Sequence, residues 1–453
     1  MNNNTTQLGE EKITTLLMKF SVPAIIAMIV NAIYNIIDRV FVGQFVGESA
    51  LAALTVVFPF MMIVFAIANL IGNGGVSLIS ICLGEQNKAK ANHVFGNMLC
   101  AVLGFIAVIV FCAFIGMDNL LAILGADADV IVYARDYLEI ILIGFIPQTI
   151  SFCLNGVVRT EGKPILAMQS MLIGAISNII LDAVFIVGFG WGVKGAAWAT
   201  IMGQLLSLAV LLPYFIKKQS IVRLYPKNLI INFNLLGKIM SIGASSFMMT
   251  AGTSFAMIVL NTYLATYGGN SALTAMGAIN SLFTLFFMPL MGIQQGTQPI
   301  IGYNHGANKH DRVRQTLLQG LKITTAFSII MFLLLETFPE MFIGMFLDKT
   351  SDTMNIAVQG LRLYVLSVPV ISINIIAMGY FQAIASSLKA IILGASRQFI
   401  LLIPAVMILA PTFGLTGVWM ATPIADCIAV ALSVVMLIPV VVNKNLASVI
   451  ENS

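Results

Sequence analysis

Charged side chains are scarce in this chain of 453 residues: only 9% are Asp, Glu, Lys or Arg, whereas 59% are hydrophobic. Soluble domains carry roughly 25% charged residues, because a folded surface in water needs them. A chain of this length with so few charges cannot cover an aqueous surface. The sequence therefore predicts an integral membrane protein whose outer surface contacts the lipid bilayer.

Patterns typical of other protein classes are also missing. The five cysteines lie inside apolar runs, with neither metal-ligand spacing nor the spacing of a disulfide framework. The sequence has no Walker-type Gly-Lys-Ser/Thr motif and no evident nucleophile and base constellation, and its three histidines form no metal pattern. We therefore expect no enzyme activity, no ATP-driven transport and no cofactor. The net charge of +4 gives no indication of nucleic-acid binding.

Long apolar runs are what the sequence does contain. Crossing a bilayer as a helix takes roughly 20 apolar residues, and the runs here are too long and unbroken for the alternating strands of a barrel. The first run, residues 16–37, is too long for a signal peptide and is expected to be a membrane helix. Charges, Gly and Pro between the runs predict an all-α protein of twelve transmembrane helices, near residues 14–38, 50–76, 93–116, 131–156, 164–187, 195–216, 239–265, 272–300, 315–338, 356–382, 388–410 and 416–441.

The distribution of Lys and Arg predicts the orientation of these helices. Cytoplasmic loops of membrane proteins collect basic residues. Alternate segments hold 18 of the 23 basic residues, and the other set holds Arg39, Arg135, Lys194, Lys349 and Arg362. We expect a multi-pass protein of the cell (inner) membrane with both termini in the cytoplasm.

An internal repeat divides the chain into two halves. One constant shift in numbering aligns four glycines of the first half, Gly47, Gly74, Gly84 and Gly192, with four of the second, Gly269, Gly296, Gly306 and Gly414. Six helices per half give both halves the same orientation, so a pseudo-two-fold axis along the membrane normal is expected to relate two six-helix bundles. The predicted parts are an N-terminal lobe (1–216), a solvated cytoplasmic linker (217–238) and a C-terminal lobe (239–453).

Four acidic residues fall inside apolar helices: Asp38, Glu139, Asp182 and Asp426. An ionised carboxylate at the centre of a bilayer costs about 2.5–3.5 kcal/mol on insertion scales, so such residues often mark ion or proton pathways. The seventh, eighth and tenth helices contain no acid. If an ion drives this protein, its site is expected in the first half.

Helical spacing gathers polar partners around two of these acids. Three stripes share helix faces at spacings of three or four residues: Asn31, Tyr34, Asn35 and Asp38; Asn178 and Asp182; and Thr200 and Gln204. Two carboxyls with amides and a hydroxyl suit a shared proton, or Na⁺ bound by hard oxygens. Interhelical hydrogen bonding is the alternative, and it accounts adequately for Asn35, Thr200 and Gln204.

Three segments resemble those of the multidrug and toxic compound extrusion (MATE) family. Residues 34–43 read Tyr-Asn-Ile-Ile-Asp-Arg-Val-Phe-Val-Gly, which is similar to that family's first-helix motif. Residues 292–304 resemble its eighth-helix signature, and residues 177–182 its fifth-helix Asn…Leu-Asp pattern, although Ala183 replaces the Pro often found next. The resemblance extends over the whole chain.

This resemblance implies a V-shaped pair of six-helix bundles that exports amphipathic, often cationic drugs or toxic compounds in exchange for H⁺ or Na⁺. It assigns the cation site to Asp38, Asn178, Asp182 and Thr200, as in the branch of the family whose ion site lies in the N-terminal lobe. A monomer is expected. The candidates for contact with the substrate are Asn31, Tyr34, Asn155, Gln204 and Asp426.

Two other functions remain open on the sequence alone. One is a flippase for lipid-linked oligosaccharides of the same superfamily, although such proteins often have a basic cavity and the buried charges here are acidic. The other is a membrane-embedded enzyme, for which no catalytic constellation is evident.

Overall fold

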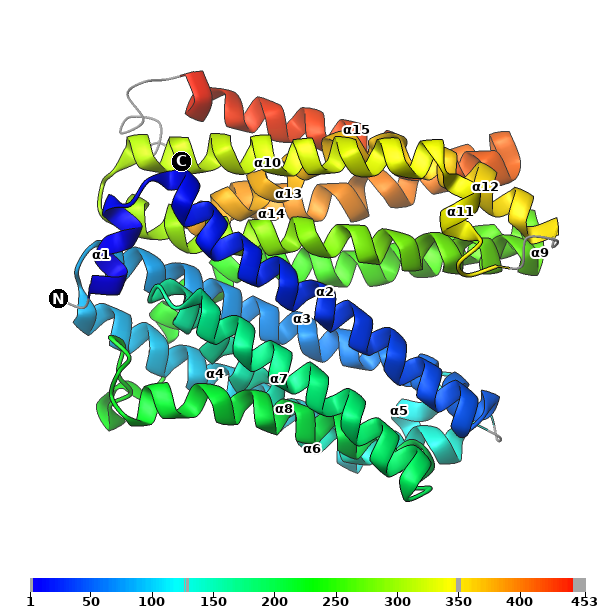
Figure 1. Ribbon diagram of the computed structural model, residues 1–453, viewed down its shortest axis with the longest axis horizontal. Coiled ribbons are helices and arrows are strands. Elements are labelled where there is room, and N and C mark those ends of the chain that lie inside the picture. The colour runs from blue at the N-terminus through cyan, green and yellow to red at the C-terminus, as the bar shows by residue number, and fades with distance from the viewer. Residues whose placement is uncertain (1–2, 126, 128–129, 348–351, 443–453) are drawn as a thin grey trace.

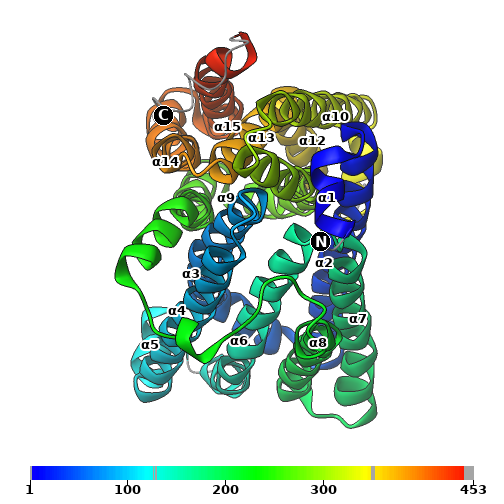
Figure 2. The ribbon, with the colours of Figure 1, turned by 90° about the vertical axis from the view of Figure 1, so that its left-hand side faces the viewer.

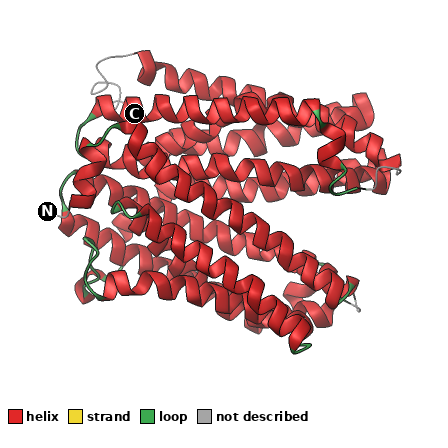
Figure 3. Ribbon diagram, in the orientation of Figure 1, coloured by secondary structure: helices red, strands yellow, loops and turns green. Residues whose placement is uncertain are grey.

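The computed structural model describes residues 3–125, 127, 130–347 and 352–442, and within these residues it contains helices and no strand (Figure 3). Lys349 and the C-terminal residues from 443 onward lie outside the described residues. The long helical elements are α2 (Ile13–Phe45), α3 (Glu48–Gly84), α4 (Lys88–Ile115), α6 (Ile131–Thr160), α7 (Pro164–Asp182), α8 (Gly192–Ile216), α9 (Phe233–Gly306), α10 (His310–Thr337), α12 (Asp352–Tyr364), α13 (Val368–Ala383), α14 (Ser387–Ala395) and α15 (Ile403–Val442).

Shorter elements complete or connect these helices. The π-helical turns η1 (Ala183–Gly188) and η4 (Ser396–Leu402) continue α7 and α14, and the 3-10 turn η3 (Val365–Ser367) joins α12 to α13. The sequence analysis did not predict four short elements: α1 (Asn3–Glu10), α5 (Met117–Ile123), η2 (Pro226–Asn228) and α11 (Pro339–Ile343).

The number of membrane crossings follows from two breaks. Ten helical runs among the described residues are long and apolar enough to span a bilayer. A straight helix of 74 residues, the length of α9, would extend about 111 Å, far beyond the hydrocarbon layer. Gly269 in α9 (φ 62°) and Gly414 in α15 (φ 59°) have non-helical backbones, and each divides its run into two crossings. The prediction of twelve transmembrane helices is confirmed.

Two pairs of glycines from the sequence repeat occupy equivalent turns. Gly47 (φ 119°) and Gly192 (φ 58°) are the repeat partners of Gly269 and Gly414, and all four have positive φ. Glycine adopts this backbone without the steric penalty that other residues meet. These two pairs thus mark points where the chain reverses between consecutive helices.

Two bundles of helices are packed side by side, the first bundle being α2–α8 and the second α9–α15 (Figures 1 and 2). We call the end that carries α1 and residues 217–232 the linker side, and the opposite end the open side. The bundles approach each other on the linker side and diverge toward the open side (Figure 1). Large apolar side chains such as Phe111, Ile115 and Ile400 are exposed on the outside, as expected for helices in lipid.

Close backbone contacts join the bundles on the linker side. A Cβ atom on Gly74 of α3 would lie 2.0 Å from the carbonyl oxygen of Ile239 in α9, and one on Gly296 would lie 2.5 Å from Ser21 of α2. Gln298 Nε2 also donates to Ser77 Oγ across the interface (2.8 Å). Small residues allow helices to approach in this way in membranes, and here they hold the linker side shut.

The connection between the bundles, residues 217–238, is largely exposed, but hydrogen bonds attach its first part to the first bundle. Glu161, at the end of α6, accepts hydrogen bonds from Tyr214 Oη (2.6 Å), Ser220 Oγ (2.7 Å) and the Val222 amide (2.8 Å). Burial raises the pKa of the Glu161 carboxyl above its ordinary value, although these donors oppose the shift. The sequence pattern missed this attachment because its partners lie far apart along the chain.

Helix α2 is longer than predicted, and the difference changes the position of Asp38. The expected helix ended at residue 38, but α2 continues to Phe45. Arg39, whose charge suggested the end, lies over the ring of Phe58 at 5.4 Å, so the helix accommodates it. Asp38 is therefore a full two turns inside the helix end.

Candidate functional site

The two aspartates of the first bundle meet between α2 and α7. Asp182 is fully buried and Asp38 partly buried, and their carboxyl groups lie close enough to share a hydrogen bond. The Oδ1 atom of each is buried and has no hydrogen-bond partner. The site thus combines two acids with two unused acceptor oxygens inside an apolar bundle.

Asn178 and Thr200 lie beside this pair. Asn178 is buried one turn before Asp182 on α7, and Thr200 belongs to α8. When the side-chain amide of Asn178 is oriented so that both its nitrogen and its oxygen have partners, it donates to Asp182 Oδ2 (3.3 Å) and accepts from the backbone amide of Thr200 (3.2 Å). The structure brings together all four residues assigned to the cation site.

Two tyrosines border the aspartates. Tyr34, one turn before Asp38 on α2, is an electrostatic neighbour of both acids, and so is Tyr137 of α6. Tyr137, which is only 4% exposed, was not among the candidates that the sequence indicated. No spacing within α6 relates it to α2 or α7, so only tertiary packing could identify it. Asn31 lies on the same face of α2 as Tyr34. Its backbone carbonyl accepts a hydrogen bond from Asn35 Nδ2 (2.7 Å).

Hard oxygen ligands dominate this site. Carboxylate, amide and hydroxyl oxygens suit Na⁺, and two adjacent carboxyls can hold a single proton between them because two negative charges repel at short range. Among the described residues, no group of three or more His, Cys, Asp or Glu side chains could hold a metal ion.

Gln204 and Asn155, two of the candidate substrate contacts, lie where α6 packs against α8 and α7, respectively. Gln204, on α8, directs its Oε1 toward Gly144 of α6, and this oxygen is buried without a partner. Asn155 Nδ2 donates to the Ala167 carbonyl (2.8 Å) and Ser170 Oγ (2.9 Å) of α7. The Asn155 amide group thus ties α6 to α7.

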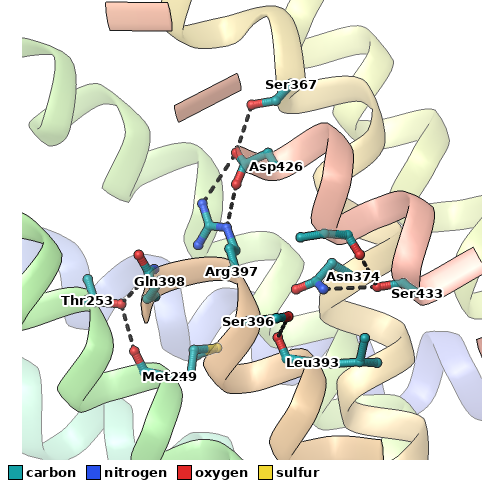
Figure 4. A network of polar contacts seen from close by, with 11 residues as sticks. Met249, Thr253, Ser367, Asn374, Leu393, Ser396, Arg397, Gln398, Asp426 and Ser433 are labelled. Carbon is teal, nitrogen blue, oxygen red and sulfur yellow. Dashed lines mark hydrogen bonds and ion pairs between the residues drawn. The ribbon is translucent and has the colours of Figure 1, made fainter. Parts of the chain in front are cut away.

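Asp426 lies in the second bundle, apart from the other candidates, and its charge is already paired (Figure 4). Arg397 Nε donates to Asp426 Oδ1 at 2.5 Å and Arg397 Nη2 to Oδ2 at 3.4 Å. Ser367 Oγ also donates to Oδ2 (2.8 Å). Glu139, the fourth intramembrane acid, has an exposed side chain on α6. Neither acid contributes to the carboxyl pair.

Comparison with known proteins adds independent information. Residues 23–184 and 245–408 match the MatE family, and the shift between the starts of these two stretches equals that of the glycine repeat. The multidrug export protein MepA of Staphylococcus aureus is 29% identical over 426 residues, and MepA of Staphylococcus saprophyticus is 27% identical over 430 residues. Each alignment covers 93% of both chains.

Solved structures share the fold over its full length. A multidrug resistance MATE family transporter of the MOP superfamily, in an outward-facing conformation, has a TM-score of 0.92 at 23% identity with complete coverage of both chains. A MOP superfamily transporter from Pyrococcus furiosus, described by a binding pocket of reverse polarity, has a TM-score of 0.89 at 24% identity, covering 96% and 97% of the two chains.

The family match covers more than half of the chain, and the twelve-helix fold agrees with it. This protein belongs to the MATE family of multidrug efflux transporters, and it is a transporter and not an enzyme.

Proposed function

We propose that this MATE transporter expels amphipathic, often cationic compounds and that H⁺ or Na⁺ bound at Asp38 and Asp182 drives their export. The single observation that carries the proposal is the contact of these carboxyl groups inside an apolar bundle, each with a buried oxygen that has no partner. Such oxygens are costly to bury unless a cation or proton occupies them. Asn178 and Thr200 complete the proposed cation site.

The proposed energy transfer is electrostatic. A unit charge that crosses the membrane gains about 2.3 kcal/mol per 100 mV, and a pH gradient adds to this if the ion is a proton. Only a group that binds the ion on one side and releases it on the other can use that energy. Asp182 and Asp38 are suited to this because ion binding and release change the charge held between α2 and α7.

The substrate path is proposed to begin at the polar face of α2. Asn31 and Tyr34 are partly buried and lie in the middle part of α2, on the stripe that ends at Asp38. Asn155, Gln204 and Asp426 are proposed as further substrate contacts, although Asp426 would have to exchange its pairing with Arg397. The relatives named as multidrug export proteins support drugs or toxic organic cations as substrates.

The proposed orientation places the linker side in the cytoplasm. It is supported by the 18 basic residues of the segments assigned to that side, against five for the other. The divergence of the bundles then makes this an outward-facing conformation of a monomer in the cell (inner) membrane. We further propose residues 1–216 and 239–453 as the two lobes and residues 217–238 as their connection.

Reconstituted vesicles test the proposal directly. Purified protein in liposomes should move a fluorescent organic cation against its gradient when an opposing H⁺ or Na⁺ gradient is imposed, and should stop when that gradient is collapsed. Transport that ignores both gradients would overturn the coupling. Translocation of a lipid-linked sugar, with no movement of organic cations, would instead favour the flippase function.

A further inference from the structure

Arg159 lies where the two bundles meet on the linker side. It is the second-last residue of α6, and its Nη1 donates a hydrogen bond to Oε1 of Gln295 in the second bundle. Among the described residues it takes part in no ion pair. A guanidinium carries five N–H donors, so a single neutral acceptor leaves most of its binding capacity unused.

A small pocket adjoins this guanidinium. Its polar lining is Asn155, Arg159 and Gln295, and most of the remaining lining is apolar. The apolar part includes Phe20 of α2 and Met168 of α7. An unpaired cation beside apolar walls is unfavourable unless an anion joins it. Flexible Met side chains adapt to ligands of different shape.

The second bundle shows how this protein neutralises an internal arginine when no ligand is needed. Arg397 donates through two nitrogens to Asp426, a built-in carboxylate. Within the described part of the chain Arg159 has no carboxylate partner, and its counterpart in the sequence repeat is the uncharged Phe381. A planar guanidinium matches a carboxylate in bidentate geometry. The missing partner of Arg159 is therefore expected to come from outside the chain.

We infer that Arg159 forms an anion subsite that captures amphiphilic substrates carrying a carboxylate, such as zwitterionic drugs. This rests on the proposed export function. Gln295 occupies Arg159 while the linker side is closed. When the bundles separate there, Gln295 moves away with α9, and the guanidinium faces the opening with its donors free.

The subsite is distinct from the cation site. Helix α7 begins at Pro164, another residue of this pocket, and reaches Asp182 eighteen residues later, about 27 Å along its axis. One small drug cannot contact both places at once. Arg159 thus acts when a substrate enters from the linker side, and the carboxyl pair acts on the driving ion.

A matched pair of substrates tests this inference. A zwitterionic fluoroquinolone and its methyl ester share one scaffold, and only the first carries a carboxylate. In vesicles reconstituted with the full-length protein, Arg159→Gln should raise the ratio of the KM for the acid to that for the ester at least about tenfold, since a charge-assisted hydrogen bond is lost. Arg159→Lys should fall between, because lysine keeps the charge without the bidentate geometry.

Gln295→Glu provides a second, independent variant. It supplies Arg159 with a carboxylate of its own, as Asp426 does for Arg397, and should raise the same KM ratio. Lys90→Gln, which removes one exposed charge from the linker side, is the control and should leave the ratio unchanged.

The ratio of the KM values for acid and ester in the variants tests the inference. An unchanged ratio in Arg159→Gln overturns the inference, and so does an equal loss for acid and ester, which would make Arg159 a closure residue only. An effect that depends on the acidic lipid content of the vesicles, and not on the substrate, would assign the subsite to a lipid phosphate and also overturn it. The proposed function fails separately, if the wild-type protein does not export the ester under any ion gradient.

Discussion

The two bundles share a fold but differ in the chemistry of their interiors. In the first, Asp38 and Asp182 lie next to each other between α2 and α7, and the Oδ1 atom of each is buried without a hydrogen-bond partner. In the second, Asp426 is the one fully buried acid among the described residues, and Arg397 neutralises it. The sequence repeat pairs Asp38, Asn178 and Asp182 of the first bundle with Leu260, Ile400 and Pro404 of the second.

The two bundles share the features needed for packing but differ in the residues proposed to bind the coupling ion. The repeated features are turns and close helix contacts, such as Gly74 and Gly296 on the linker side. They set how the bundles pack against each other, and both halves need them. A coupling ion needs a site in only one half. An unpaired acid in the second bundle would cost energy without a corresponding use, and Arg397 removes that cost at Asp426.

The largest expected effect comes from removing the charge of Asp182, because its repeat partner in the second bundle, Pro404, is uncharged. Asp182→Asn keeps the size and hydrogen-bonding capacity of the side chain but removes its charge. We expect gradient-driven efflux to fall to the rate of vesicles without protein, with dye binding retained. Asp38→Asn should do nearly the same.

Glu139→Gln is the matched control for that experiment. It removes an acid from the same bundle, but one whose side chain is exposed, and efflux should stay near the wild-type rate. Wild-type efflux in both aspartate variants would remove the carboxyl pair from the coupling mechanism.

The second prediction breaks the pair in the second bundle. Asp426→Asn leaves the largely buried Arg397 without its counter-charge, and the loss of one partner of a buried ion pair costs about 3–5 kcal/mol. The thermal unfolding midpoint of the purified protein in detergent should fall markedly. Arg397→Gln combined with Asp426→Asn should recover most of that loss, because no unpaired charge remains. A double variant as unstable as the single one would show that packing, not charge, sets the stability there.

The sequence predicted much of the fold because helical membrane proteins carry their pattern locally. Long apolar runs identified the twelve crossings, and the glycine repeat divided the chain into two halves of six helices each. Asn178 and Asp182 were found because a spacing of four brings side chains onto one helix face. In each case the signal lies in the same stretch of chain as the feature that it predicts.

Contacts between distant helices were not predictable in this way. Arg397 and Asp426 are 29 residues apart, and Arg159 and Gln295 are 136 apart. No periodicity connects such positions, so the sequence alone could not pair Asp426 with Arg397 or Arg159 with Gln295. The coupling role of Asp38 and Asp182 stays a prediction, although the structure places their carboxyls together.

The third prediction concerns the contact between the bundles on the linker side, to which both halves contribute a glycine of the repeat. Gly74→Ala and Gly296→Ala each introduce a methyl group too close to the opposite bundle, and such overpacking costs roughly 1–3 kcal/mol. Both should shift the protein toward the conformation that is open on the linker side, by similar amounts. Cysteine labelling from the linker side would measure the shift.

Gly104→Ala is the control for the third prediction, because a Cβ at this position on α4 would meet no atom within 4 Å. It should leave labelling unchanged. Strongly unequal shifts in the two interface variants would contradict the view that the repeat preserves this contact in both halves.

The smallest expected effect lies at Glu161, which has no acidic counterpart in the second half, because the sequence repeat pairs it with Ala383. Burial raises the pKa of the Glu161 carboxyl, so its ionised form is less favourable in the folded protein than in the unfolded chain. Its contribution to stability is therefore full below the ordinary glutamate pKa and is lost as the pH rises through the folded-state value.

Glu161→Gln should flatten this part of the pH profile of thermal unfolding, by no more than about 1 kcal/mol because three donors already oppose the pKa shift. The quantity to compare is the difference between the wild-type and variant profiles, since Asp38 and Asp182 are present in both. A wild-type profile that gains stability over the same interval, relative to Glu161→Gln, would show that the donors outweigh burial.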